Sequence, residues 1–221
     1  MLDAVDLGFN GLEARPGDHI CGMYTGERQR DAIVLPFLEA GLRAGDKCLC
    51  IVDSIDPASL IAKVDPKLDA RQRADVNQLV VMRAAHVYSR SGAFSATETI
   101  GFWKMAVSEA MYDRRFEMVR AIDTWSQRDI VVDPHEHLLL ESEMNRFVPL
   151  YPQVVVCLYD LEQFGGSLVV NLLKTHPKVL LGGLLLENPY FMTPDEVIAA
   201  AASEAETPGS PREVAVPGAA S

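Results

Sequence analysis

The chain has 221 residues, of which 48% are hydrophobic and 23% are charged, and its formal net charge is -11. This size and composition fit one globular domain, alone or with extensions. The acidic balance argues against direct binding to nucleic acid, because neutralising phosphates requires clustered Lys and Arg. No apolar run approaches the length of a membrane span, and the N-terminus carries acids rather than an apolar signal segment, so we expect no membrane contact.

The first elements follow an alternating order of strand and helix. Residues 1–16 form a lead that the pattern does not place, and residues 17–24 are a short strand signal. Apolar residues at helical spacing predict a helix over 27–44, with Pro36 expected to kink it and Gly45 suited to the position just past its end. A strand is expected next, over 47–52.

The alternation continues to the end of the apolar sequence. Helix starts are marked by Asp56-Pro57, by the Ser95 to Glu98 capping box, by Asp133-Pro134 and by Thr193-Pro194. The remaining strand signals lie at 78–82, 118–122, 154–160, 179–181 and 184–186, and a further helix is expected over 165–174. This order predicts an α/β fold, with a mostly parallel central sheet and helices on both faces.

The strand at 154–160 is expected at the centre of the sheet. Its apolar run is β-branched at the start and closed by an acid, as in strands that are buried on both faces. The carboxyl ends of central strands border the ligand crevice in open α/β sheets. Tyr159 and Asp160 are therefore candidate ligand-binding residues.

The loop after the first strand lacks the chemistry of a nucleotide-binding P-loop. Such a loop needs Gly-x-x-x-x-Gly-Lys-Ser/Thr, in which the lysine neutralises the phosphates. The corresponding segment, from Gly22 to Arg28, is one residue short, and Glu27 stands where the lysine is required. The sequence therefore predicts the architecture of the P-loop class without ATP hydrolysis, and we expect no cofactor.

Several separated motifs, in the same order, resemble the MEDS domain, the sensory domain of DcmR-type regulators. They are Gly17-Asp-His-Ile-Cys-Gly-Met-Tyr24, the segment 36–51, Cys157-Leu-Tyr-Asp160 and Thr175-His-Pro177. The resemblance runs from about residue 16 to 192. It implies a RecA-like three-layer sandwich with a degenerate P-loop, related to circadian-clock ATPases, that senses simple hydrocarbon derivatives for transcriptional or kinase signalling. We accordingly divide the chain into the lead 1–16, a MEDS-like sensory domain 17–202 and a disordered tail 203–221.

Candidate ligand-binding residues come from several of these motifs, and each has a structural alternative. His19 and Cys21 are two residues apart on a strand, so their side chains share one face. There they either reach a ligand or serve as core residues. His176 is directed towards extended geometry by Pro177, and the alternative is a surface loop. Trp125 walls a pocket or belongs to the core. The full set of candidate ligand-binding residues is His19, Cys21, Tyr24, Trp125, Glu141, Tyr159, Asp160 and His176.

The sequence offers little support for catalysis or for a metal site at His135 and His137. His135 and His137 are two apart on a helix, so they face different ways and make a poor metal pair. No Ser-His-Asp order or paired-carboxylate spacing is present, and we expect neither catalytic nor metal-binding residues. The four cysteines, without paired spacing, are typical of a reducing cytoplasm.

Two classes of function remain open from the sequence. The first is a non-catalytic small-molecule sensor that signals through a separate regulator, kinase or other signalling protein, because a fused output module is not found in this sequence; a homo-oligomer is compatible with it. The second is a metal-binding protein or enzyme that uses His19, Cys21, Asp160 and His176.

Overall fold

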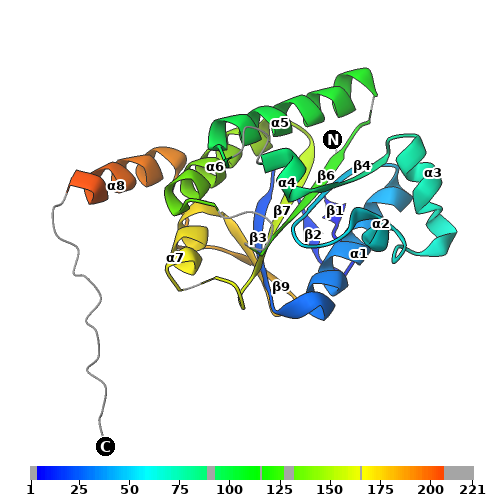
Figure 1. The fold of residues 1–221 in the computed structure, drawn as a ribbon, viewed down its shortest axis with the longest axis horizontal. Coiled ribbons are helices and arrows are strands. Elements are labelled where there is room, and N and C mark those ends of the chain that lie inside the picture. The colour runs from blue at the N-terminus through cyan, green and yellow to red at the C-terminus, as the bar shows by residue number, and fades with distance from the viewer. Residues whose placement is uncertain (1–3, 89–92, 115, 127–131, 165, 207–221) are drawn as a thin grey trace, which may run out of the picture.

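The fold is organised around one seven-stranded sheet with the strand order β5-β4-β6-β7-β3-β8-β9 (Figure 1). The structure, a computed structural model, describes residues 4–88, 93–114, 116–126, 132–164 and 166–206. All neighbouring strands in this order are parallel except the last pair, in which β9 is antiparallel to β8. The strands are β3 (His19–Tyr24), β4 (Lys47–Val52), β5 (Leu79–Arg83), β6 (Val119–Trp125), β7 (Gln153–Asp160), β8 (Lys178–Leu181) and β9 (Leu184–Glu187).

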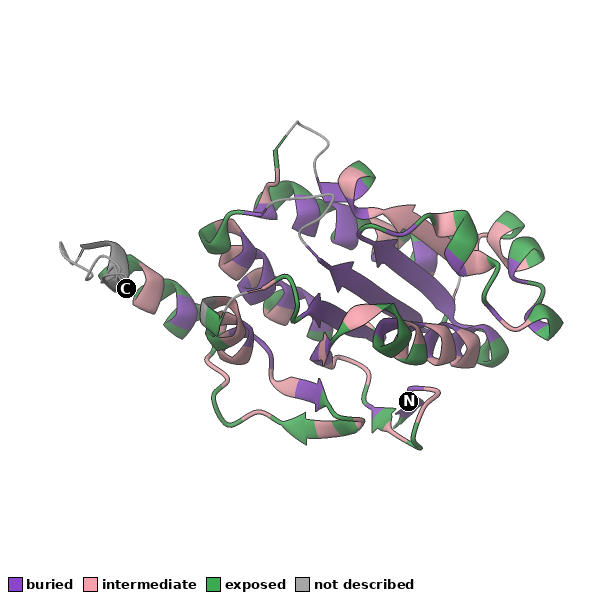
Figure 2. Ribbon diagram, turned by 60° about the horizontal axis from the view of Figure 1, so that its bottom comes forward, coloured by how far each residue is buried: buried purple, intermediate pink, exposed green. Residues whose placement is uncertain are grey.

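Helices cover both faces of this sheet, and its central strands β4, β6 and β7 are buried throughout, whereas β9 at one edge is largely exposed (Figure 2). One core joins the sheet to α4 (Ala84–Tyr88), α5 (Ala96–Ser108), α6 (Pro134–Phe147) and α7 (Gly166–Thr175). The opposite core joins it to α1 (Gly26–Ala44), α2 (Pro57–Ile61) and α3 (Ala70–Asp75). The predicted three-layer α/β fold, with β7 in the middle of the sheet, is confirmed.

Local sequence signals position the helices as expected. The side chains of Asp56, Ser95 and Asp133 each accept a hydrogen bond from a backbone N–H in the first turn of α2, α5 and α6. Gly45 ends α1 with a φ of 86°, a left-handed conformation that glycine adopts without a steric cost. These caps fix where α6 begins, and therefore which of its side chains face the sheet.

Two details of the sheet and helices add to the expected pattern. The residues on both sides of Pro36 belong to one helix, α1, and the kink expected there stays a prediction. The sheet ends in an antiparallel hairpin, because Gly182 and Gly183 both have positive φ, 59° and 80°, as the favoured tight hairpin turn requires.

The two ends of the described chain carry more structure than the sequence predicts. In the lead, β1 (Val5–Asp6) and β2 (Glu13–Ala14) form a two-stranded sheet, and the neighbouring Leu7 is fully buried in the α1 core. At the other end, α8 (Pro194–Glu206) includes the first residues of the predicted disordered tail. The rest of that tail, 207–221, and residues 1–3 lie outside the described residues.

The remaining short elements are η1 (Pro66–Leu68), η2 (Glu109–Asp113) and η3 (Val148–Leu150). Among the described helices, none has the combination of length and apolar character that crossing a membrane requires.

Candidate functional site

Four buried side chains with metal-ligating atoms meet between the sheet and the helices α6 and α7. They are His19, Glu141, Cys157 and His176, which we call the four-donor cluster. One donor atom from each lies within 4.8 Å of the others. The residues come from three elements, β3, α6 and β7, and from the segment that follows α7, so only the folded chain brings them together.

Strand and helix periodicity explain how the cluster forms. His19 begins β3, and Cys157 lies on the adjacent parallel strand β7, both on the face that α6 covers. Glu141 lies on the buried side of α6. His176 directly follows α7, and its backbone N–H donates to the carbonyl of Leu172, which holds the residue against the helix end.

The two carboxylate oxygens of Glu141 have different surroundings. Oε1 accepts a hydrogen bond from the Tyr159 hydroxyl at 2.6 Å, and His137 Nε2 lies 3.4 Å away. Oε2 lies 3.2 Å from Nε2 of His19 and 3.2 Å from Nε2 of His176. Neither of these contacts has the geometry of a hydrogen bond, and Oε2 has no hydrogen-bond partner among the described residues.

Hydrogen bonds on the far side of each imidazole determine its orientation. Asn145 donates its amide N–H groups to the carbonyls of Glu141, at 2.9 Å, and Thr175, at 2.5 Å. Its Oδ1 is therefore an acceptor, and His19 Nδ1, at 3.0 Å, donates to it. His176 Nδ1 likewise donates to the Leu172 carbonyl at 3.0 Å. In the neutral rings, both Nε2 atoms therefore direct a lone pair into the cluster.

Burial and charge act in opposite directions on the ionisable groups. Burial would raise the pKa of Glu141, but its interactions with His176, His19 and His137 outweigh this and hold the pKa well below the usual value. Burial lowers the pKa of His176 and of His137. Burial, followed by the charge of Glu141, raises the pKa of the Cys157 thiol. A buried carboxylate therefore lies beside two imidazoles, those of His176 and His137, in which burial favours the neutral form.

An aromatic layer adjoins the cluster on the side of β6. Trp125 stacks on Tyr88, with ring centroids 5.0 Å apart, and on Tyr159, with centroids 6.3 Å apart. The Trp125 ring also meets His137 edge to face at 5.1 Å. Tyr159 thus has one face in the aromatic layer and its hydroxyl on Glu141.

The sequence-predicted site residues divide into two groups. His19, Glu141, Tyr159 and His176 come together, and Trp125 stacks on Tyr159. Cys21 is paired in register with Cys157 but is not one of the four donors.

Tyr24 and Asp160 lie apart from the cluster. They are paired in register at the ends of β3 and β7, and Tyr24 belongs to the opposite core, with α1. Asp160 Oδ1 accepts a hydrogen bond from the Glu162 N–H at 3.1 Å, which stabilises the turn after β7. A role for either residue in ligand binding stays a prediction.

The sequence prediction missed Cys157 and His137 as members of the site. Cys157 lies two residues before Tyr159, so strand alternation places both on one face. His137 lies four residues before Glu141, the spacing that brings side chains together on a helix. The neighbouring His135 is exposed, so the unfavourable spacing of the two histidines did separate them as expected.

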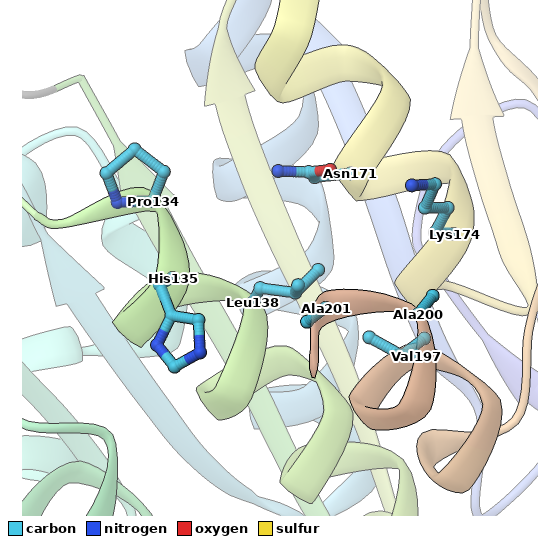
Figure 3. A pocket seen from close by; sticks show the side chains of 8 residues that line it. All are labelled: Pro134, His135, Leu138, Asn171, Lys174, Val197, Ala200 and Ala201. Atoms are coloured by element: carbon cyan, nitrogen blue, oxygen red, sulfur yellow. The ribbon is translucent and has the colours of Figure 1, made fainter. Parts of the chain in front are cut away.

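A surface pocket lies nearby, between α6, α7 and α8, and encloses about 200 Å³ (Figure 3). No member of the four-donor cluster lines it. Its lining residues are Pro134, His135, Leu138, Asn171, Lys174, Val197, Ala200 and Ala201. The four-donor cluster is thus an interior site.

The sheet order and the helices on both faces define a RecA-like α/β protein. A solved structure with this fold, the flagellar accessory protein FlaH from Methanocaldococcus jannaschii, matches with a TM-score of 0.52 over 84% of each chain, at 11% sequence identity. That likeness concerns the fold alone.

Comparison of the sequence with known protein families identifies the family of this chain. The family described as MEDS, the methanogen/methylotroph DcmR sensory domain, matches residues 18–177, which is most of the chain and includes all four donors. The chain belongs to the MEDS family. No curated protein matches it.

Proposed function

We propose that this protein is a non-catalytic sensory domain that receives a small ligand at the interior site formed by the four-donor cluster and the adjacent aromatic layer, and signals through a separate regulator or kinase. The family is a sensory one. The observation that carries the proposal is the buried Glu141 carboxylate, which has one oxygen without a hydrogen-bond partner among the described residues.

The surroundings of Glu141 suit a small hydrocarbon derivative. Ligand sites combine apolar walls with a few polar groups that fix orientation. Trp125 and Tyr159 supply an apolar wall, and Glu141 and His19 supply polar groups that recognise one substituent. Binding then changes the packing of α6 and α7 against the sheet, which a partner protein detects as a change at the surface.

On the opposite face of the sheet, the residue at the start of α1 disfavours nucleotide binding. Glu27 is exposed in the first turn of α1, where a P-loop protein neutralises phosphates with a lysine. A carboxylate there repels the phosphate groups. This supports a sensory domain that uses the RecA-like fold without its nucleotide.

The test uses Trp125 as an internal probe. In a Trp103→Phe background, all tryptophan fluorescence comes from Trp125, since the chain has two tryptophans. Titration with one-carbon and two-carbon alcohols, amines, thiols and halides is expected to give a saturable fluorescence change for at least one class. His19→Ala is expected to weaken that binding about tenfold to hundredfold while cooperative melting persists, because one buried hydrogen bond is lost.

The matched control is His135→Ala, which removes an exposed histidine from α6 and is expected to leave the affinity unchanged. A flat titration for every class of compound contradicts the proposed small-molecule ligand. Unchanged affinity in a folded His19→Ala protein removes the interior cluster from the site.

A further inference from the structure

We propose that the four-donor cluster is a binding site for a divalent transition metal ion, with Zn²⁺ as the best match. This inference rests on the proposed function in that it assigns a ligand to the same interior site. It differs from the metal alternative considered from the sequence, because Glu141 and Cys157 take the places of Cys21 and Asp160.

Three of the six distances between donor atoms match edges of a coordination tetrahedron, and all four donors lie within 4.8 Å of one another. With zinc bonded to nitrogen or oxygen at about 2.0 Å and to sulfur at about 2.3 Å, tetrahedral geometry separates two N or O donors by about 3.3 Å, and N from S by about 3.5 Å. Glu141 Oε2 lies 3.2 Å from each imidazole Nε2, and Cys157 Sγ lies 3.5 Å from His19 Nε2.

The orientation of the donors also favours a bound cation. Both imidazoles donate from Nδ1 to fixed acceptors, so in the neutral rings both Nε2 lone pairs point towards the Glu141 carboxylate. Three electron-rich atoms then face one another in a dry interior, without hydrogen bonds between them. A metal ion at their centre turns this repulsion into coordination and satisfies Oε2 and His176 Nε2 together.

The surrounding hydrogen bonds are those expected around a metal site. Ligating histidines normally donate their other N–H to a carbonyl or carboxylate, and ligating carboxylates are themselves hydrogen-bonded. Here Asn145 and the Leu172 carbonyl hold the two imidazoles, and Tyr159 holds Glu141 through Oε1. Oε2 is thereby left for the metal.

The donor set selects the class of metal. Two imidazoles, a carboxylate and the Cys157 sulfur form a mixed set of borderline, hard and soft donors, which suits zinc rather than magnesium or calcium. Cys157 binds as the thiolate, and its proton is released to solvent when the metal binds. Four protein donors close the tetrahedron, whereas catalytic zinc keeps one position open. The site therefore suits a sensory or structural role, in which the metal ties β3, β7, α6 and the end of α7 together.

The primary experiment uses the wild-type chain without a histidine tag. The protein is stripped with a chelator, incubated with Zn²⁺, desalted and analysed for metal. We expect roughly one zinc ion per chain. Loading with Co²⁺ is expected to give the intense visible bands of tetrahedral cobalt and a thiolate-to-cobalt charge-transfer band. A folded wild-type protein that retains no zinc and gives no cobalt spectrum overturns the proposal, whatever the variants do.

Matched cysteine variants locate the thiolate ligand. Cys157→Ser is expected to abolish the charge-transfer band, whereas Cys21→Ser, at the paired position on the adjacent strand, is expected to retain it. His135→Ala is expected to leave the zinc content unchanged, because His135 is exposed and outside the cluster. Loss of the band in Cys21→Ser with retention in Cys157→Ser contradicts the assigned donor set.

Failure of this inference is distinguishable from failure of the proposed function. Saturable binding of an organic ligand by a protein that retains no zinc after loading overturns the metal site and leaves the small-molecule sensor standing. Stoichiometric zinc with flat Trp125 titrations supports the metal site and contradicts the small organic ligand.

Discussion

At the residue scale, Tyr159 connects the aromatic layer to the buried carboxylate. Its ring stacks with Trp125, and its hydroxyl donates to Glu141 Oε1. Hydrogen bonds to a buried charged group are stronger than those between neutral groups, because the charge has no water to replace them. Tyr159 is therefore expected to hold Glu141 in place.

The substitution Tyr159→Phe keeps the ring and removes the hydroxyl, which donates to Glu141 Oε1 and also lies 3.1 Å from His137 Nε2. We expect the free energy of unfolding to fall by about 1.5 to 3 kcal/mol, measured by urea denaturation. Tyr190→Phe is the control, since the Tyr190 side chain is 70% exposed, and its unfolding is expected to match the wild type. Equal stability of all three proteins contradicts the assigned role of the Tyr159 hydroxyl.

Lys47, which lies outside the four-donor cluster, makes the stability of the fold depend on pH. Burial lowers its pKa from 10.5 to about 8 in the folded protein, although its ammonium group donates to Asn77 Oδ1 at 3.0 Å. Between these two pKa values, the unfolded chain holds a proton that the folded chain has lost. Stability from this residue therefore rises as the pH increases from about 8 to about 10.5.

Removing the charge should remove this dependence. Relative to Lys47→Met, the wild-type free energy of unfolding is expected to gain up to about 3 kcal/mol across that pH window. Denaturation curves of both proteins at pH 7.5, 9 and 10.5 measure the difference. A difference that stays constant with pH would falsify the lowered pKa of Lys47.

At the element scale, the N-terminal hairpin belongs to the folded core. Leu7 is fully buried against α1, and the Arg120 guanidinium on β6 donates to the carbonyl of Asp6. Arg120 also pairs with Asp46 at 2.6 Å in a buried salt bridge. Arg120 thus links the hairpin to the buried ion pair between β6 and the start of β4.

Truncating Leu7 tests this docking. Leu7→Ala is expected to lower the free energy of unfolding by about 2 to 5 kcal/mol, as for other buried leucines. Val76→Ala provides the comparison, because Val76 is 60% exposed and its loss should change stability little. If Leu7→Ala behaves like Val76→Ala, the hairpin does not contribute to the core.

Sequence patterns predicted elements better than contacts between them. Helix caps at Asp56, Ser95 and Asp133, and the apolar run of β7, depend on neighbouring residues and are visible in the sequence. The choice between Cys21 and Cys157 as a partner for Glu141 depends on where α6 lies above two strands whose cysteines are in register. No local sequence pattern encodes the position of α6 relative to these two strands.

At the scale of the whole molecule, the two faces of the sheet have different chemistry. The α1 face retains the position of a phosphate loop, but Glu27 is there in place of a lysine. The α6 face holds the four-donor cluster. The candidate site is therefore separate from the place where a P-loop protein binds its nucleotide.

Isothermal titration with magnesium and ATP tests the α1 face. No micromolar binding is expected, because the Glu27 carboxylate repels phosphate where attraction is needed. Micromolar affinity in the wild-type protein would mean that the RecA-like fold binds nucleotide here through other groups.

Native mass spectrometry of the wild-type protein and Glu141→Gln, isolated in parallel from the host, tests the central claim most directly. Glu141→Gln keeps the shape of the side chain and removes the buried charge on which the interior site depends. The wild type is expected to carry an added mass, from a metal ion or a small organic ligand, and the folded variant is expected to lack it. A wild-type mass equal to that of the bare chain, or the same added mass in both proteins, contradicts the interior cluster as the receiving site.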